Sequence, residues 1–93
     1  MQMLMIIVES RYKEKVEATL SERRVLGYTE IPTVYGTGRT GPRLGSRAFP
    51  ETSSIIFTVV EAARVPELRA AIQKSCDCGE TMRMIVWKVD QML

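Results

Sequence analysis

Four short runs of apolar residues, separated by polar stretches, set the pattern of this chain. They cover residues 3–8, 28–35, 54–61 and 82–89. Each run has the length of a β-strand, and the first and third are apolar at successive positions, which is typical of strands buried on both faces. Pro32 lies inside the second run and cannot donate a ladder hydrogen bond, so this strand is predicted at a sheet edge or a bulge.

Two stretches between the runs carry apolar residues four positions apart, the spacing of an amphipathic helix. The apolar positions are Tyr12, Val16 and Leu20 in the first stretch, and Leu68, Ile72 and Cys76 in the second. Ser10 is the expected N-cap of the first helix, because its hydroxyl can accept a hydrogen bond from a free backbone N–H group. Pro66 suits the first turn of the second helix, and Gly79 is expected to end it.

The predicted order of elements is strand, helix, strand, strand, helix, strand, with no linker or internal repeat. This βαββαβ order predicts a ferredoxin-like α+β domain over residues 1–93. The domain would have a four-stranded antiparallel sheet, two helices on one face and a long loop between its second and third strands. Right-handed crossovers place the first and third strands at the centre of the sheet.

Both central strands are predicted to be apolar on both faces. In the first strand, Leu4, Ile6 and Val8 alternate with Met3, Met5 and Ile7, and the third strand has the same character. Two helices cover only one face of such a sheet, and an antiparallel sheet with one face in water should alternate. We therefore expect a second copy of the chain to cover the other face, most simply in a closed ring. The alternative is that the extra apolar residues lie at strand ends and tolerate exposure.

The segment 36–52, between the second and third strands, is rich in glycine and proline. Four glycines and two prolines fall within residues 36–50, so the segment is predicted to be irregular, and such long loops are usually functional or disordered. It carries three arginines against one acid, in a chain with a net charge of +2; they are Arg39, Arg43 and Arg47. An anionic ligand or partner would explain this local positive charge, and a solvated connector is the alternative.

Composition excludes several classes of function. The chain has 93 residues and no histidine, which removes the commonest general base and the commonest metal ligand. Nucleophile-elbow and Walker motifs are absent, so no enzymatic activity is expected. The small net charge and the missing RNP aromatic patterns predict no nucleic acid partner. The opening apolar run is too short to span a bilayer and resembles no targeting signal, so no direct membrane insertion is expected.

The cysteines, Cys76 and Cys78, are separated by one residue. Such a pair cannot join distant segments, so no disulfide framework is predicted, and a cytoplasmic, reducing compartment is expected. Cys76 continues the apolar stripe of the second helix and is expected in the core. Alternatively, the pair could hold a soft metal together with Asp77 and Glu80 if subunits pooled ligands, although one chain offers too few strong ligands for a closed zinc site.

Three motifs on this frame resemble the PII family of trimeric nitrogen and carbon signalling proteins. Residues 27–29, Gly-Tyr-Thr, are similar to the Gly-Met-Thr that enters the family's second strand. Residues 34–41, Val-Tyr-Gly-Thr-Gly-Arg-Thr-Gly, resemble the Val-x-Gly-x-Gly-Arg-x-x-Gly at the root of the family's mobile T-loop. Residues 65–68, Val-Pro-Glu-Leu, resemble the Val-Pro-Asp-x-Leu that opens its second helix. Segment 36–52 then corresponds to the T-loop.

The resemblance implies a homotrimer whose clefts between subunits bind adenine nucleotides, and a T-loop that docks on a transporter, channel or enzyme. By position, Thr29 would lie beside the base, and the other ligand-binding residues would be Gly36, Gly38, Arg39, Thr40 and Gly41. Arg43 and Arg47 would face a partner. Thr40 stands where the family has a glutamine that helps to hold magnesium, and residues 76–81 replace its second phosphate-binding segment.

Two other functions stay open on the sequence alone. One is a metal-responsive trimer of the related CutA-like shape, which would use Cys76 and Cys78. The other is a structural interaction domain whose loop binds a partner and takes no small ligand.

Overall fold

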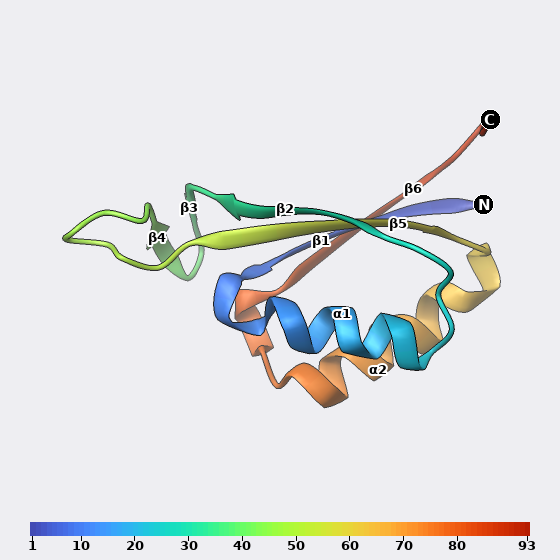
Figure 1. Cartoon of the computed structure of the whole chain (residues 1–93), viewed down its shortest axis with the longest axis horizontal. Coiled ribbons are helices and arrows are strands. Elements are labelled where there is room, and N and C mark those ends of the chain that lie inside the picture. Colours follow the sequence, from blue (N-terminus) through green and yellow to red (C-terminus); the bar gives the residue numbers. More distant parts are fainter.

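The computed structural model describes residues 1–93 and contains the predicted four-stranded sheet (Figure 1). The strand order is β2-β5-β1-β6, and every neighbouring pair is antiparallel. The strands are β1 (Gln2–Glu9), β2 (Thr29–Val34), β5 (Ser53–Val60) and β6 (Arg83–Lys88). The first and third predicted strands, β1 and β5, lie at the centre, so the ferredoxin-like α+β prediction is confirmed.

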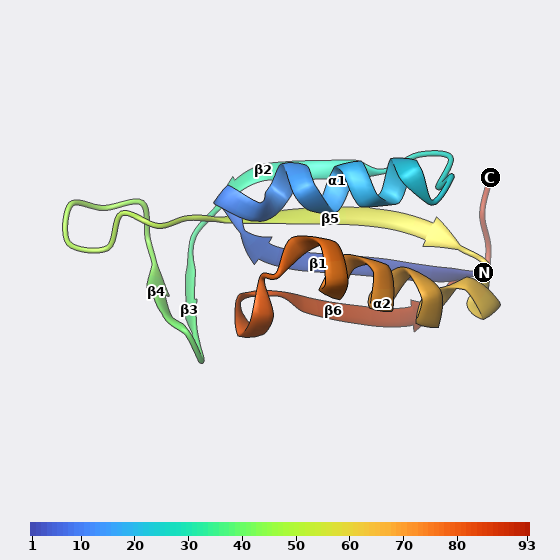
Figure 2. The ribbon, with the colours of Figure 1, turned by 90° about the horizontal axis from the view of Figure 1, so that it is seen from below.

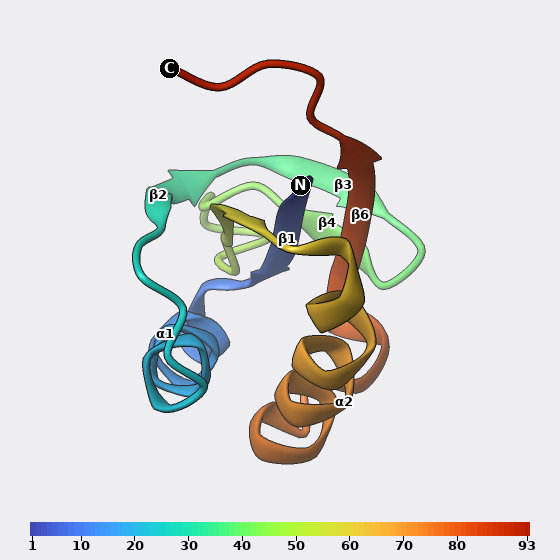
Figure 3. The ribbon, with the colours of Figure 1, turned by 90° about the vertical axis from the view of Figure 1, so that its right-hand side faces the viewer.

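Two α-helices pack side by side on one face of this sheet (Figure 3). They are α1 (Lys13–Glu22) and α2 (Val65–Cys76), each preceded by a short 3-10 helix, η1 (Ser10–Tyr12) or η2 (Ala62–Arg64). The inner residues of both helices meet alternate residues of the central strands. The largest fully buried side chains of this core are Leu4, Ile6, Leu20, Ile56, Leu68 and Ile72. Cys76 belongs to the same core, as predicted.

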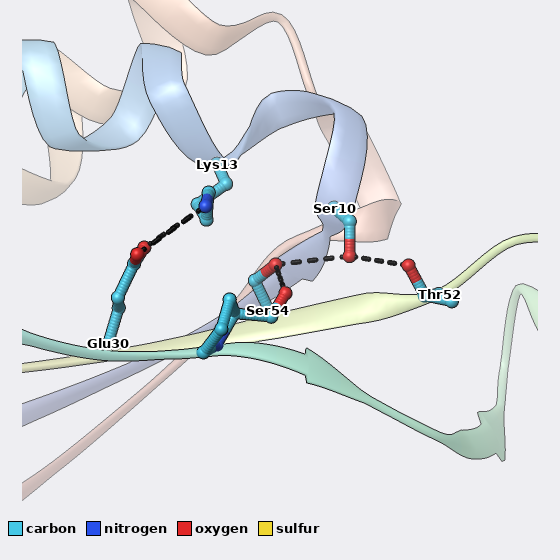
Figure 4. Close-up of polar contacts among 6 residues, drawn as sticks. Ser10, Lys13, Glu30, Thr52 and Ser54 are labelled. Carbon is cyan, nitrogen blue, oxygen red and sulfur yellow. Dashed lines mark hydrogen bonds and ion pairs between the residues drawn. The ribbon is translucent and has the colours of Figure 1, made fainter. Parts of the chain in front are cut away.

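Two predicted helix ends are wrong. Ser10 does not cap α1, because it opens η1 and its hydroxyl instead forms hydrogen bonds with the hydroxyls of Thr52 and Ser54 (Figure 4). Gly79 does not end α2. Asp77 does so in a left-handed conformation with φ 51°, which aspartate tolerates better than most residues, and Gly79 begins a further 3-10 helix, η3 (Gly79–Thr81).

Strand β2 forms an edge of the sheet, as Pro32 predicts. Its pairing with β5 is regular from Thr29 to Ile31 and then shifts register before Val34. The Pro32 carbonyl accepts a hydrogen bond from the Ser54 hydroxyl, 2.6 Å away, so the irregular part of the strand is still tied to β5. The prediction of an edge strand with a bulge is therefore confirmed.

The segment 36–52 is not irregular throughout, which corrects the sequence prediction. Two short strands, β3 (Gly36–Gly38) and β4 (Gly41–Arg43), pair as an antiparallel hairpin apart from the main sheet. Gly41 adopts φ 103°, a conformation that glycine takes without the usual penalty, and it closes the tight connection through Arg39 and Thr40. Glycine here permits a hairpin, whereas the sequence predicted irregular structure from it.

Beyond the hairpin, residues 44–52 form a turn that projects from one end of the molecule, opposite both chain termini (Figure 2). Backbone hydrogen bonds order it, including Gly45 N–H to the Glu51 carbonyl at 3.0 Å. Gly45 has φ 60°, and a Cβ atom there would lie 2.6 Å from the Tyr35 ring. The Tyr35 side chain therefore packs where only a glycine leaves room.

The second face of the sheet has no cover within the chain. The strand register places its side chains in rows across the sheet, and these rows are Ile31-Ile55-Ile7, Phe57-Met5-Ile85 and Val59-Met3-Trp87. Trp87 is 43% exposed and Ile31 42% exposed, while the residues of the central strands are half-buried. We call these nine residues the open face. Its apolar character confirms the sequence analysis, and its occupant stays a prediction. No helix in the structure combines the length and the apolar character needed to cross a membrane.

Candidate ligand-binding site

A cavity of about 330 Å³ lies where the main sheet meets the β3–β4 hairpin. Ile7 and Ile55, at one end of the open face, contribute apolar wall, and Glu80 and Arg83 come from the segment that leads into β6. The hairpin, together with the two residues that precede it, supplies Val34, Tyr35, Gly36, Thr37, Gly38, Arg39, Thr40 and Arg43. The cavity thus joins four separate segments of the sequence: β1, the hairpin with its preceding residues, β5 and the start of β6.

The lining is strongly cationic. It contains three arginines, Arg39, Arg43 and Arg83, and one acid, Glu80. The Nη1 atom of Arg43 is buried and has no hydrogen-bond partner. A buried guanidinium nitrogen without an acceptor is costly, and an anionic oxygen would satisfy it with a charge-assisted bond. Gly36 and Gly38 also let a ligand approach the backbone N–H groups closely.

A second set of charges lies near Arg43, at the end of β1. Glu9, at the end of β1, is 6% exposed and pairs with Arg11, whose Nε lies 3.1 Å from a Glu9 carboxylate oxygen. Burial raises the pKa of Glu9, and a hydrogen bond with Glu51 raises it further, while the charges of Arg11 and Arg43 lower it. Arg43 of the hairpin thus adds a favourable positive charge near the end of β1.

The structure brings together most of the residues predicted as ligand-binding. Gly36, Gly38, Arg39 and Thr40 all line the cavity, whereas Thr29 and Gly41 do not. Thr29 pairs with Phe57 on the open-face side of the sheet. Of the arginines expected to face a partner, Arg43 lies in the cavity, whereas Arg47 is exposed in the projecting turn.

The sequence analysis missed Glu80, Thr81 and Arg83 as cavity residues. One signal could have found Arg83, because it is a charge inside the apolar run 82–87 and so departs from the pattern of a buried strand. Its position opposite Ile7 places it on the open-face side of the sheet. Glu80 and Thr81 carried no comparable signal, because their placement depends on the turn after α2.

In the oxidised form that the structure shows, the cysteine pair offers no free thiolate to a metal, contrary to the metal alternative. Cys76 and Cys78 are joined to each other by a disulfide bond, so neither sulfur is a thiolate. Asp77 between them and Glu80 after them are both exposed. The bond spans a sequence separation of 2, so it closes a very small loop and does not connect distant parts of the fold.

A separate charged contact joins α1 to β2. Lys13 Nζ lies 3.3 Å from a carboxylate oxygen of Glu30, on the helix-covered side of the sheet (Figure 4). Glu17, one helical turn further on, shares a hydrogen bond with Glu30. Burial and the nearby Glu30 carboxylate raise the pKa of Glu17 to about 7, although Lys13 opposes the shift. The hydrogen bond from Glu17 lowers the pKa of Glu30.

We expect the Glu17 carboxyl to make folding weaker as the pH rises. Glu17 keeps its proton up to about pH 7 in the folded chain, whereas the unfolded chain loses it near 4.5. The stabilisation is therefore complete below pH 4.5 and is lost as the pH rises through 7. After allowance for solvent screening, the free energy of unfolding should fall by about 1 kcal/mol across this range.

Urea denaturation of wild type and Glu17→Gln at pH 5 and pH 8 measures this effect. The amide cannot ionise, so the part of the pH dependence that comes from Glu17 should disappear in the variant. Glu22→Gln, an exposed substitution on the same helix, is the matched control and should behave as wild type. Equal pH dependence in wild type and Glu17→Gln would contradict the assignment.

Almost the whole chain matches one known protein family. The model of the family described as Nitrogen regulatory protein P-II matches residues 1–92. A search of the curated proteins gives no match.

Proposed function

This chain belongs to the nitrogen regulatory protein P-II family, and from that premise we propose that it is a trimeric regulator that binds an adenine nucleotide in the arginine-lined cavity. Proteins of this family are signal-transduction regulators and not enzymes. The proposal accordingly gives the chain a ligand and a target, and no reaction of its own.

The observation that carries the proposal is the buried, unpartnered Nη1 of Arg43 in a cavity with two further arginines, Arg39 and Arg83. Three guanidinium groups around one space suit a polyanion such as a phosphate chain. The volume of about 330 Å³ is at the small end of ligand pockets, which run from roughly 300 to 1,000 Å³. The apolar wall at Ile7 and Ile55 offers a surface for a flat base.

The trimer is supported by the place of the cavity as well as by the open face. Ile7 and Ile55 belong both to the open face and to the cavity wall. A neighbouring copy that covers the open face would therefore also reach the mouth of the cavity. Such a neighbour would enlarge the site and exclude water from it, which strengthens every charge interaction inside.

The hairpin connects ligand binding to a target. Its strands β3 and β4 supply Arg39 and Arg43 to the cavity and lead directly into residues 44–52. A ligand that holds Arg39 would favour one arrangement of the projecting turn over others. Arg47, Leu44 and Phe49 are exposed there and would dock on a protein such as a membrane transporter, at its cytoplasmic side. No nucleic acid takes part in this scheme.

Titration calorimetry with ATP tests the proposed function. Wild type should bind ATP, and Arg39→Ala should bind it about ten- to hundredfold more weakly, because a charge-assisted hydrogen bond is lost. Arg47→Ala removes the same side chain from the projecting turn, outside the cavity, and should leave ATP affinity unchanged. Equal loss in both arginine variants, or no heat of binding with wild type, would contradict a nucleotide site at this position.

A further inference from the structure

The disulfide between Cys76 and Cys78 lies directly before one wall of the cavity. Cys76 is the last residue of α2, and both cysteines belong to the core, with exposed fractions of 0% and 4%. Two residues after Cys78 the chain enters the cavity wall at Glu80, and by Arg83 it has entered β6. The short path between the disulfide and the wall makes the geometry of one depend on the other.

Specific contacts transmit this dependence. The backbone carbonyl of Cys78 accepts two hydrogen bonds from Thr81, one from its N–H at 2.9 Å and one from its hydroxyl. Thr81 lines the cavity together with its neighbours Glu80 and Arg83. The position of the Cys78 backbone therefore sets where the turn η3 stands and where β6 begins.

The disulfide constrains this turn and little else. A cross-link stabilises a fold mainly by closing a loop of the unfolded chain, and the gain grows with loop length. A bond between residues 76 and 78 closes almost no loop, so its reduction should leave the global fold intact. Between the two cysteines Asp77 holds φ 51°, a left-handed conformation that residues with a side chain rarely adopt. Without the bond, this residue is free to leave that conformation and the turn to shift.

We propose that the Cys76–Cys78 pair is a redox-responsive element that sets the affinity of the arginine-lined cavity for its anionic ligand. This inference rests on the function proposed above and adds a second input to the same site. The oxidised pair holds Glu80, Thr81 and Arg83 in the cavity wall, and this form binds the anion more tightly. The reduced pair releases the turn and weakens binding.

The chemistry is thiol–disulfide exchange with a small-molecule disulfide such as oxidised glutathione. The Cys78 thiolate attacks one glutathione sulfur, and the other glutathione leaves as a thiolate. Cys76, once deprotonated, then attacks the Cys78 sulfur and expels the second glutathione. The protein loses two electrons and two protons and gains one S–S bond, while one glutathione disulfide becomes two thiols. Cys78 reacts first because Cys76 lies at a helix C-terminus, where the helix dipole disfavours a thiolate.

Access to the pair requires only a local opening. Asp77, Gly79 and Glu80, which flank Cys78 along the chain, are all exposed. Movement of this short turn uncovers the Cys78 sulfur without separating α2 from the sheet. A reducing compartment therefore does not conflict with the bond, because the pair would exchange between its two forms as the thiol pool changes.

The test uses the full chain equilibrated with reduced or with oxidised glutathione, and each form is verified by mass after alkylation. Titration with ATP and, separately, with inorganic tripolyphosphate gives the affinity of each form. We expect the oxidised form to bind about tenfold more tightly than the reduced form. Amide hydrogen exchange should be faster on reduction in residues 79–83 and unchanged in β5. Cys78→Ala, which cannot form the bond, should bind equally in both buffers.

The outcomes separate the two proposals. Equal affinities and equal exchange in the two wild-type forms overturn the redox inference and leave the nucleotide site standing. Redox-dependent binding of tripolyphosphate without any binding of ATP keeps the redox inference and ends the nucleotide proposal. Loss of secondary structure on reduction, or a disulfide that resists millimolar reduced glutathione, would make the bond a structural link and overturn the inference. Binding of neither probe overturns both proposals.

Discussion

Replacing Phe57 by glutamate should convert the assembled protein into monomers of about one third the mass. Phe57 lies on a central strand, between Thr29 and Met5 across the open face, and is half-buried in the single chain. A neighbouring copy would bury it fully. A carboxylate at this position would then have to lose its water without gaining a partner, which costs several kcal/mol for each subunit. In the free monomer the same carboxylate keeps contact with water, so the fold itself survives.

Sedimentation velocity of wild type and Phe57→Glu gives this result directly. Gln73→Glu is the matched control, because it adds the same charge on the exposed side of α2, on the opposite side of the sheet. It should sediment as wild type. A wild-type chain that stays a folded monomer at micromolar concentration would contradict both the prediction and the proposed trimer.

Replacing Leu20 by alanine should remove a large part of the stability of the fold. Leu20 is 0% exposed and lies near the end of α1, in the core between helices and sheet. Truncation of a buried leucine costs about 2–5 kcal/mol, from the lost apolar contact and the cavity that is left. A domain of this size is stable by roughly 5–15 kcal/mol, so the loss is a substantial share.

Leu26 offers the matched control for this measurement. It is 104% exposed, in the connection between α1 and β2, so the same substitution there should change the free energy of unfolding by less than about 0.5 kcal/mol. Both variants are compared with wild type by urea denaturation at one protein concentration, because assembly makes apparent stability depend on concentration. Similar losses for Leu20→Ala and Leu26→Ala would contradict the core described here.

The sequence predicts the fold well because its strongest signals are regular. Short apolar runs mark every strand of the main sheet, a repeat of nearly four residues marks both α-helices, and Pro32 places β2 at an edge. The apolar open face follows from the unbroken apolar run of β1, because Met3, Met5 and Ile7 would be polar if their face of the sheet lay in water. These properties depend on many residues at once, so no single contact can reverse them.

The parts that sequence reasoning misplaced depend on single tertiary contacts. Ser10 has the right chemistry for a helix cap, but its hydroxyl forms hydrogen bonds with Thr52 and Ser54 instead. Asp77, and not Gly79, takes the left-handed position after α2, next to the bonded cysteines. None of these partners can be identified before the chain is folded.

Some residues of the candidate site could likewise be predicted from the sequence, and others could not. The glycines and arginines of the hairpin could be predicted, because a local motif places Gly36, Gly38 and Arg39 together. Arg83 could not be placed with them, because it reaches the cavity only through the pairing of β6 with β1. Arg43 was assigned to a partner for a similar reason, since the hairpin that turns it inward gives no periodic signal.

The two edges of the sheet limit how copies of this chain can associate. A protein with such an apolar face is at risk of joining its neighbours strand to strand and growing into fibres. The proline and register shift of β2 leave that edge a poor template for a further strand. At the other edge, β6 begins with Arg83 and ends with Lys88, and charges at such positions repel an identical strand. Stacking through the face can end in a closed particle of fixed size, whereas unprotected edges would have allowed polymerisation without limit.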